Sequence, residues 1–130
     1  MKTKAIVTGH SRGLGEAIAA ALLDDGVEVL GLSRKPSAAL ERKAGSKLTQ
    51  LTVDLADPPA LAGNDLAHRL EAFLANADRV LLINNAGMVQ PIGPLGSGGA
   101  QAIVSAVTLN VAAPLALADL FQAITAPIAD

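Results

Sequence analysis

Four short apolar runs, each followed by a helix-forming run, constrain the fold of this chain more than any other feature. The apolar runs are KAIVTG, VEVLGLS, KLTQLTVDL and RVLLIN. They are rich in β-branched and other apolar residues and have the length of buried strands. Strands that alternate with helices form a parallel sheet, because right-handed crossovers place the helices on both of its faces. The sequence therefore predicts a doubly wound α/β fold.

The helix-forming runs follow the four apolar runs in order. They are LGEAIAAALLDDG, SAALERKAG, DPPALAGNDLAHRLEAFLAN and residues 100–125. We expect the third to be one helix with Asp57 as its N-cap, because prolines are tolerated at the first helical positions. Its apolar stripe is Leu66, Leu70, Phe73 and Leu74. The fourth is apolar nearly all round, which predicts a helix covered on more than one face.

The composition excludes several classes of function. A length of 130 residues allows one domain or part of one, and a net charge of −2 does not favour nucleic acid as a partner. The absence of cysteine excludes disulfides and thiolate metal sites, and the two histidines, His10 and His68, lie far apart in the sequence. Residues 100–118 come nearest to a membrane span, but polar residues and Pro114 interrupt them. We expect a soluble, cytoplasmic protein with no membrane partner.

The stretch TGHSRGLG, residues 8–15, joins the first predicted strand to the first predicted helix. Free N–H groups and the macrodipole at a helix N-terminus favour an anion, and glycines allow its phosphates to approach the backbone. The spacing is a variant of the dinucleotide fingerprint, and it lacks the Gly-Lys-Ser/Thr ending of a P-loop. Without further motifs, a tight turn that binds no ligand is the main alternative explanation of these glycines.

Three later motifs support a cofactor-binding role for this loop, although each also has an ordinary structural explanation. LINNAG ends the fourth predicted strand, where open α/β sheets bind ligands, but Asn-Ala-Gly also forms plain turns. Asp54 ends the third predicted strand, where an Asp often begins a turn. Asn110 lies inside the last helix, four residues before Pro114, which has no N–H for the Asn110 carbonyl. That proline alone accounts for a helix kink.

Taken in this order, the four motifs resemble those of the short-chain dehydrogenase/reductase family. The resemblance implies a Rossmann sheet of strand order 3-2-1-4, incomplete because the C-terminal strands of the family are absent. It also implies that the carbonyl of Asn110 holds a water of the catalytic proton relay. The cofactor-binding residues that it implies are Gly9, Ser11, Arg12, Gly13, Leu14, Gly15, Arg34, Asp54, Leu55, Asn85, Ala86 and Gly87.

The end of the second predicted strand indicates which nicotinamide cofactor is preferred. An acidic residue at this position binds the ribose 2′-hydroxyl of NAD and repels a 2′-phosphate. Here the strand is followed by Ser33, Arg34 and Lys35, and Arg12 lies in the glycine loop. A charge-assisted hydrogen bond contributes about 1.5–3 kcal/mol, so two arginines beside a 2′-phosphate favour NADP(H). Each arginine alone is also explained as a solvated surface charge.

In the family, a Ser and a Tyr-x-x-x-Lys pair carry out the chemistry, and this chain contains no tyrosine. We expect residues 1–130 to be the N-terminal part of one dinucleotide-binding domain, inactive alone. The function that the resemblance implies is NADPH-dependent reduction of a small ketone or aldehyde. The loop NNAGMVQPIGPLG is somewhat similar to that of sepiapterin reductase and bacterial diketone reductases.

An apolar fourth strand at the sheet edge and the apolar last helix predict a homo-oligomer, a dimer or a tetramer. The main alternative function is a non-catalytic dinucleotide-binding or oligomerisation module. A sugar-nucleotide epimerase fits less well, because its glycine loop usually reads G-x-x-G-x-x-G. A methyltransferase gives no reason for the Asn-Asn-Ala-Gly motif.

Overall fold

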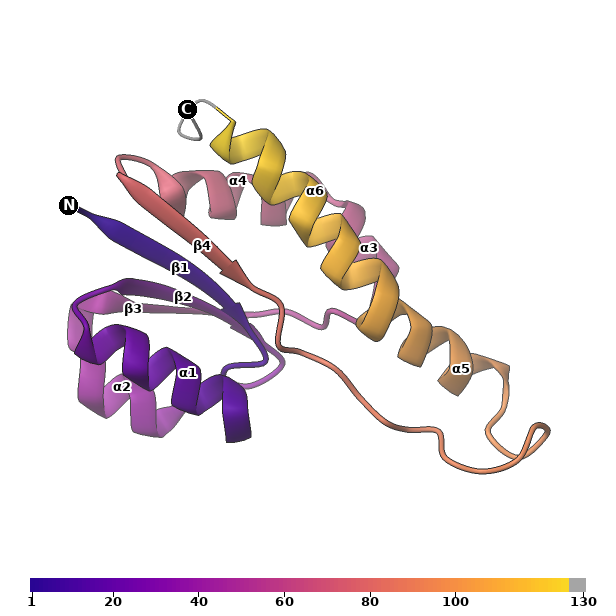
Figure 1. Ribbon diagram of the computed structural model, residues 1–130. Coiled ribbons are helices and arrows are strands. Elements are labelled where there is room, and N and C mark those ends of the chain that lie inside the picture. Colours follow the sequence, from indigo (N-terminus) through magenta and orange to yellow (C-terminus); the bar gives the residue numbers. More distant parts are fainter. Residues whose placement is uncertain (127–130) are drawn as a thin grey trace.

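A computed structural model describes residues 1–126 and contains one parallel sheet between two layers of helices (Figure 1). The strands are β1 (Thr3–Thr8), β2 (Glu28–Ser33), β3 (Leu48–Thr52) and β4 (Arg79–Ile83). All pairings are parallel, and the order across the sheet is β3-β2-β1-β4. The strand order predicted from the sequence is therefore confirmed. Within the described chain, β3 and β4 are the edges of the sheet.

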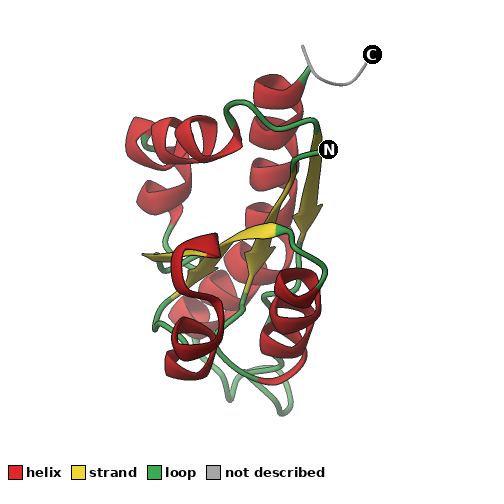
Figure 2. Cartoon of the chain, turned by 90° about the vertical axis from the view of Figure 1, so that its left-hand side faces the viewer, coloured by secondary structure: helices red, strands yellow, loops and turns green. Residues whose placement is uncertain are grey.

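The helices are divided between the two faces of the sheet. They are α1 (Gly13–Asp24), α2 (Ala38–Ala44), a 3₁₀ turn (Gly45–Lys47), α3 (Pro58–Ala62), α4 (Asn64–Leu74), α5 (Ala100–Val107), a π-helical segment (Thr108–Ala112) and α6 (Ala113–Thr125). α1 and α2 cover one face, whereas α3, α4 and α6 lie over the other (Figures 1 and 2). This two-sided cover is the doubly wound arrangement that the sequence predicts.

Two hydrophobic cores lie on opposite faces of the sheet because successive strand residues point to opposite sides. In β1, Ile6 belongs to one core, and its neighbours Ala5 and Val7 belong to the other. The first core packs β1 and β2 against α4 and α6 and includes Leu30, Leu32, Leu66, Leu70, Leu74 and Leu117. The second packs β1 and β2 against α1 and α2 and includes Ala19, Val29 and Leu40. A central strand buried on both faces therefore supports the loops at its carboxyl end.

The third helix-forming run differs from the prediction of one continuous helix. It breaks at Gly63, whose extended backbone (φ −76°, ψ 156°) separates α3 from α4. Asp57 occupies the N-cap position, but within residues 1–126 its side chain makes no capping hydrogen bond. The reason is that Pro58 and Pro59 have no N–H, and the amide of Ala60 donates to the Asp57 carbonyl oxygen at 3.1 Å.

Residues 100–125 form one long helix, but the described residues alone do not give it the cover on more than one face that the sequence predicts. Only 17% of its most apolar window is buried by the described residues, and mainly the α6 part packs on the sheet and on α4. By length and composition alone this helix is apolar enough to cross a membrane, a test that core helices of soluble proteins also pass. In its middle the N–H of Ala113 bonds to the carbonyl of Thr108, five residues earlier. This π-helical turn precedes Pro114, which has no N–H to continue the regular pattern.

Candidate cofactor site

The carboxyl ends of β1 and β4 lie side by side and are joined by hydrogen bonds. The hydroxyl of Thr8 accepts the N–H groups of both Asn85 and Ala86, each at 2.9 Å. The side-chain amide of Asn85 donates to the carbonyls of Thr8 and Gly9, at 3.2 and 3.1 Å. The Asn-Asn-Ala-Gly turn is therefore held directly against the glycine loop. The amide nitrogen of Asn85 serves this contact between loops.

Two glycines allow the loops to approach this closely. A Cβ at Gly15 would overlap the Gly9 carbonyl oxygen and the amide nitrogen of Asn85. Gly9 has a φ of +68°, and a Cβ there would lie 3.0 Å from the Cα of Ala86. Both positions exclude a side chain for reasons of packing. The glycine spacing is therefore explained by contacts within the protein at Gly9 and Gly15.

Gly13 differs, because its surroundings are open. Its φ is +57°, and a Cβ there would meet none of the described atoms within 4 Å. It is the first residue of α1, and the first hydrogen bond of the helix runs from the Glu16 N–H to the Arg12 carbonyl at 3.3 Å. The N–H groups of Gly13, Leu14 and Gly15 therefore lie ahead of the helical hydrogen bonds. Such groups at the start of a twelve-residue helix suit an anion.

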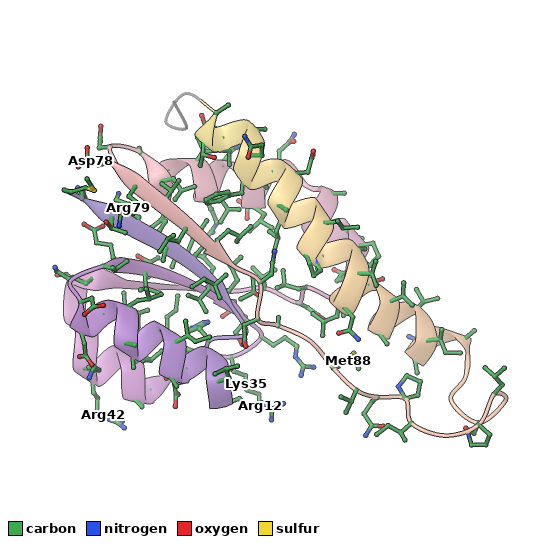
Figure 3. The ribbon with its side chains drawn as sticks, viewed as in Figure 1. Arg12, Lys35, Arg42, Asp78, Arg79 and Met88 are labelled. Carbon is green, nitrogen blue, oxygen red and sulfur yellow. The ribbon has the colours of Figure 1, made fainter. Side chains whose placement is uncertain are left out.

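The predicted basic residues lie around this helix start. Arg12, Arg34 and Lys35 are all exposed, and Figure 3 shows Arg12 and Lys35 near the beginning of α1. Within residues 1–126, none of the three forms an ion pair. The loops that carry them are linked, since the hydroxyls of Ser11 and Ser33 lie 2.9 Å apart. Among the described residues, therefore, no carboxylate neutralises these cations.

Asp54 lies at the carboxyl end of β3, beyond the last strand residue. One of its carboxylate oxygens accepts the N–H of Ala56 at 3.0 Å, and the side chain is exposed. Leu55 is buried, and its side chain belongs to the core between the sheet and α4. A cavity of about 330 Å³ opens beside Asp54 and is lined by Leu51, Thr52, Val53, Asp54, Pro59, Ala60, Gly63, Asp65, Leu66 and Arg69. No residue of the glycine loop lines it, so it is separate from the start of α1.

Asn110 is joined to the chain just after the Asn-Asn-Ala-Gly turn. Its amide nitrogen donates to the Met88 carbonyl and its amide oxygen accepts the Met88 N–H, both at 2.8 Å. A Cβ at Gly87 would lie 3.3 Å from the same amide oxygen. The sequence reasoning considered the backbone carbonyl of Asn110 and missed this side-chain bridge. The available signal was that a polar side chain within an apolar helix needs partners.

The structure thus brings three predicted motifs together and leaves one at the margin. The glycine loop, the turn at residues 84–87 and Asn110 form one connected site at the carboxyl end of β1 and β4. Asp54 lies two strands away, at the end of the outermost strand β3. Sequence reasoning did not assign a role to the hydroxyl of Thr8, which joins the first two motifs.

A parallel sheet in this order, with a glycine-rich turn between its first strand and first helix, defines a Rossmann-like α/β protein. The family model for short-chain dehydrogenases matches residues 3–124. The chain therefore belongs to the short-chain dehydrogenase/reductase family.

Comparison with individual proteins agrees with this assignment. The chain is 36% identical over 121 residues to benzil reductase ((S)-benzoin forming) from Bacillus subtilis strain 168, covering 89% of this chain and 46% of that protein. A crystal structure of a short-chain dehydrogenase/reductase from Burkholderia vietnamiensis superposes with a TM-score of 0.87 and 43% identity, covering 95% of this chain and 57% of the other. The structure of a metagenomic short-chain oxidoreductase in complex with NADP superposes with a TM-score of 0.80 and 32% sequence identity. The match covers 95% of this chain and 55% of the other. The chain thus spans about half the length of the curated relative.

Proposed function

We propose that residues 1–130 supply the cofactor-binding part of an NADPH-dependent reductase of small ketones or aldehydes. The observation that carries the proposal is the charge around the start of α1. Arg12 and Arg34 are exposed and, within the described chain, unpaired, and β2 ends at Ser33 with no acidic residue beside it. A 2′-phosphate is the part of NADPH that such a pair recognises. The similarity to a short-chain oxidoreductase solved with NADP supports the same cofactor.

The donor groups on the chain fit a dinucleotide. The N–H groups at the start of α1 suit a pyrophosphate, and the open space at Gly13 leaves room for it. The carboxylate of Asp54 keeps one oxygen free of the Ala56 contact, and we assign that oxygen to the amino group of adenine. The backbone of Leu55 lies next to it. We assign the remaining contacts to Ser11 and to the backbone of residues 85–87.

At the other end of the site, Asn110 is proposed to act on a proton rather than on the cofactor. A nicotinamide bound at this site would supply the hydride for carbonyl reduction. Pro114 offers no N–H to the Asn110 carbonyl, so this oxygen is able to hold a water for proton transfer. The side chain of Asn110 keeps that helical turn in place through its two bonds to Met88.

The cofactor preference is tested by titrating the full-length protein with NADPH and with NADH. Removing one arginine from a phosphate loses a charge-assisted bond, so Arg34→Ala and Arg12→Ala are each expected to weaken NADPH binding about tenfold. Binding of NADH should change much less. Arg42→Ala is the matched control, because Arg42 is an exposed arginine on α2 and distant from the start of α1 in Figure 3. Unchanged NADPH affinity in both variants would contradict the proposal.

The substrate class is proposed from the similarity to benzil reductase. Benzil is an aromatic diketone, and its reduction to benzoin converts one carbonyl to an alcohol. We propose a small-molecule carbonyl compound of this kind as the substrate. Oxidation of NADPH followed at its absorbance band, with benzil added to the full-length protein, tests the assignment directly. The 130-residue chain should give no turnover, because it has no tyrosine to protonate the carbonyl oxygen.

A non-catalytic dinucleotide-binding module is the second candidate, because the contacts between the glycine loop and residues 84–87 require no catalytic residue. It predicts tight NADPH binding without substrate turnover, even in the full-length protein.

We also propose a homo-oligomer in the cytoplasm. The support is an exposed apolar face on the helix over residues 100–125, formed by Ile103, Val104, Val107, Val111 and Leu115. Large exposed apolar patches are typical of interfaces between proteins. Sedimentation of the full-length protein as a monomer would contradict this.

A further inference from the structure

A row of polar side chains joins the glycine loop to the turn that carries Arg34 and Lys35. It begins at Gly31 in β2, where a Cβ would overlap three ring atoms of His10. The imidazole of His10 therefore lies against the strand and is fully buried. Gln50 of β3 pairs in register with Gly31, so its side chain lies on the same face of the sheet as the imidazole.

The amide of Gln50 is the centre of this row. Its oxygen accepts the N–H of Ser37 at 2.6 Å and lies 2.7 Å from Nε2 of His10. Since the Ser37 amide can only donate, this atom is the carbonyl oxygen, and Nε2 of His10 carries the proton of the second bond. The nitrogen of Gln50 donates to the carboxylate of Glu41 at 2.7 Å and to the Ser37 carbonyl at 3.3 Å. Four hydrogen bonds thus converge on one side chain.

Ser37 is bonded on its other side as well. Its hydroxyl donates to the carboxylate of Glu16 on α1 at 2.7 Å and accepts the N–H of Leu40 at 3.1 Å, which caps α2. At the other end of the same turn, the hydroxyl of Ser33 bonds to that of Ser11 in the glycine loop. Residues 34–36 are therefore attached at both ends to the structure around the glycine loop. The charged ends of Arg34 and Lys35 project from a fixed backbone.

We propose that Gln50 is a positioning residue for recognition of the 2′-phosphate of NADPH. It does not touch the phosphate. It holds Ser37 against His10, so that the turn carrying Arg34 keeps one position relative to the loop carrying Arg12. Two cations on separate loops bind one anion well only when their spacing is set beforehand, because ordering a mobile loop on binding costs affinity. This inference rests on the proposed preference for NADPH.

The test uses the full-length protein and two fragments of the cofactor, adenosine 2′,5′-bisphosphate and AMP, titrated by calorimetry. Only the first carries the 2′-phosphate. Gln50→Met keeps the length of the side chain and removes all four hydrogen bonds. It is expected to weaken binding of the bisphosphate about tenfold, the equivalent of one lost charge-assisted bond, and to change AMP binding by less than about twofold.

Lys4→Met is the matched control. Lys4 is a buried polar side chain near the opposite end of β1, and its ammonium donates to the carbonyls of Phe73 and Ala75 at 2.7 and 3.0 Å. Loss of these bonds lowers stability but does not alter the contacts of the turn at residues 34–36. The ratio of the affinities for the bisphosphate and AMP should therefore stay at the wild-type value.

A second variant keeps the test decisive if Gln50→Met fails to fold. His10→Leu removes the bond to Gln50 together with Nδ1, a buried nitrogen with no hydrogen-bond partner among residues 1–126. Loss of the hydrogen bond to Gln50 lowers stability, but removal of the unpaired Nδ1 from the interior offsets part of that loss. We therefore expect this variant to fold. It leaves Gln50 bonded to Ser37, and the affinity ratio should fall by about threefold, between wild type and Gln50→Met.

The outcomes separate the two proposals. If the wild type binds both fragments equally, the preference for NADPH is wrong and this inference fails with it. If the wild type prefers the bisphosphate but both variants retain the wild-type ratio, or lose both ligands equally, only the role of Gln50 is wrong. A fall in the ratio for Gln50→Met and for His10→Leu, or for His10→Leu alone if Gln50→Met does not fold, with Lys4→Met unchanged, supports it.

Discussion

The carboxyl end of β1 and the segment that follows β4 begin at the same end of the sheet but are built differently. At the end of β1, the Thr8 hydroxyl and the Asn85 amide are bonded within the chain, and glycines bring the loops into contact. Beyond Gly87, large apolar side chains lie in water, namely Val89, Ile92, Leu95, Val104, Val107, Val111 and Leu115. Leu95 is 98% exposed.

This contrast separates polar groups that are satisfied within the chain from apolar side chains that the chain itself does not cover. Buried polar groups without partners cost folding free energy. At the end of β1 the Thr8 hydroxyl and the Asn85 amide have partners within the chain, so they need none from another protein. Exposed apolar side chains in such number are typical of surfaces that another protein segment or ligand covers. The polar contacts at the end of β1 and the exposed apolar surface beyond Gly87 are therefore formed by different residues.

The largest expected effect comes from Gly15→Ala. The added Cβ overlaps the Gly9 carbonyl and the Asn85 amide, so the glycine loop and the β4 turn must separate. We expect a loss of about 3 kcal/mol in the free energy of unfolding, measured by urea denaturation of the full-length protein. NADPH binding should be lost with it.

Gly13→Ala is the matched control for Gly15→Ala. No described atom lies within 4 Å of its Cβ position, so only the strain of a positive φ remains, about 1–2 kcal/mol. Equal urea midpoints for the two variants would mean that the close contact at Gly15 is not needed for stability.

Thr8→Val has the next largest effect, because it keeps the shape of the side chain and removes only the hydroxyl. The N–H groups of Asn85 and Ala86 then lose their shared acceptor. An unsatisfied buried donor costs about 1–3 kcal/mol, and we expect a loss of about 2 kcal/mol in urea denaturation.

Two substitutions check this interpretation. Thr8→Ser retains the hydroxyl and should be much closer to the wild type. Thr52→Val, at an exposed threonine of β3, should change stability by less than about 0.5 kcal/mol. If Thr8→Ser were as unstable as Thr8→Val, the methyl group rather than the hydroxyl would carry the effect.

The alternation of strands and helices was predictable because its signals are local, whereas the strand order came from the family resemblance that the motifs carry. A glycine-rich turn after one strand and Asn-Ala-Gly after another can both be recognised from adjacent residues. Their proximity then follows from the parallel order of the sheet. The break at Gly63 was missed because the apolar period continues across it, and a single glycine is often tolerated inside a helix.

The row from His10 through Gln50 to Ser37 was not predictable from the sequence. These residues are separated by up to 40 positions, and only the register of β2 and β3 brings them together. Taken singly, Gly31 is an ordinary strand glycine and Gln50 an ordinary polar strand residue. The sequence predicts that the helix over residues 100–125 needs cover, but not which protein surface covers its exposed face. An apolar pattern shows that a surface needs cover, but it does not say whether this chain provides the cover.

Asn110→Leu tests the junction between the two regions. It removes both hydrogen bonds to the backbone of Met88, where the bonded network ends and the exposed segment begins. Since Asn110 is exposed, water replaces part of these bonds, and the loss of stability should be about 1 kcal/mol. In the full-length enzyme, kcat with benzil should fall at least about tenfold while the Kd for NADPH changes less than about twofold. A parallel rise in the Kd would show that Asn110 acts on cofactor binding instead.

The smallest effect on the stability of the single chain is expected from Val107→Asp. Val107 is 53% exposed on α5, and substitutions at exposed positions usually change the free energy of unfolding by less than about 0.5 kcal/mol. If the face is covered by a second copy in the proposed oligomer, the buried carboxylate opposes association, because an unpaired charge is costly away from water. Sedimentation should then show a shift from dimer or tetramer to monomer.

Ala72→Asp on α4 adds the same charge at another exposed helical position and should leave the assembly unchanged. An oligomer that survives Val107→Asp intact would place the interface elsewhere. The exposed apolar face beyond Gly87 would then have no role in self-association.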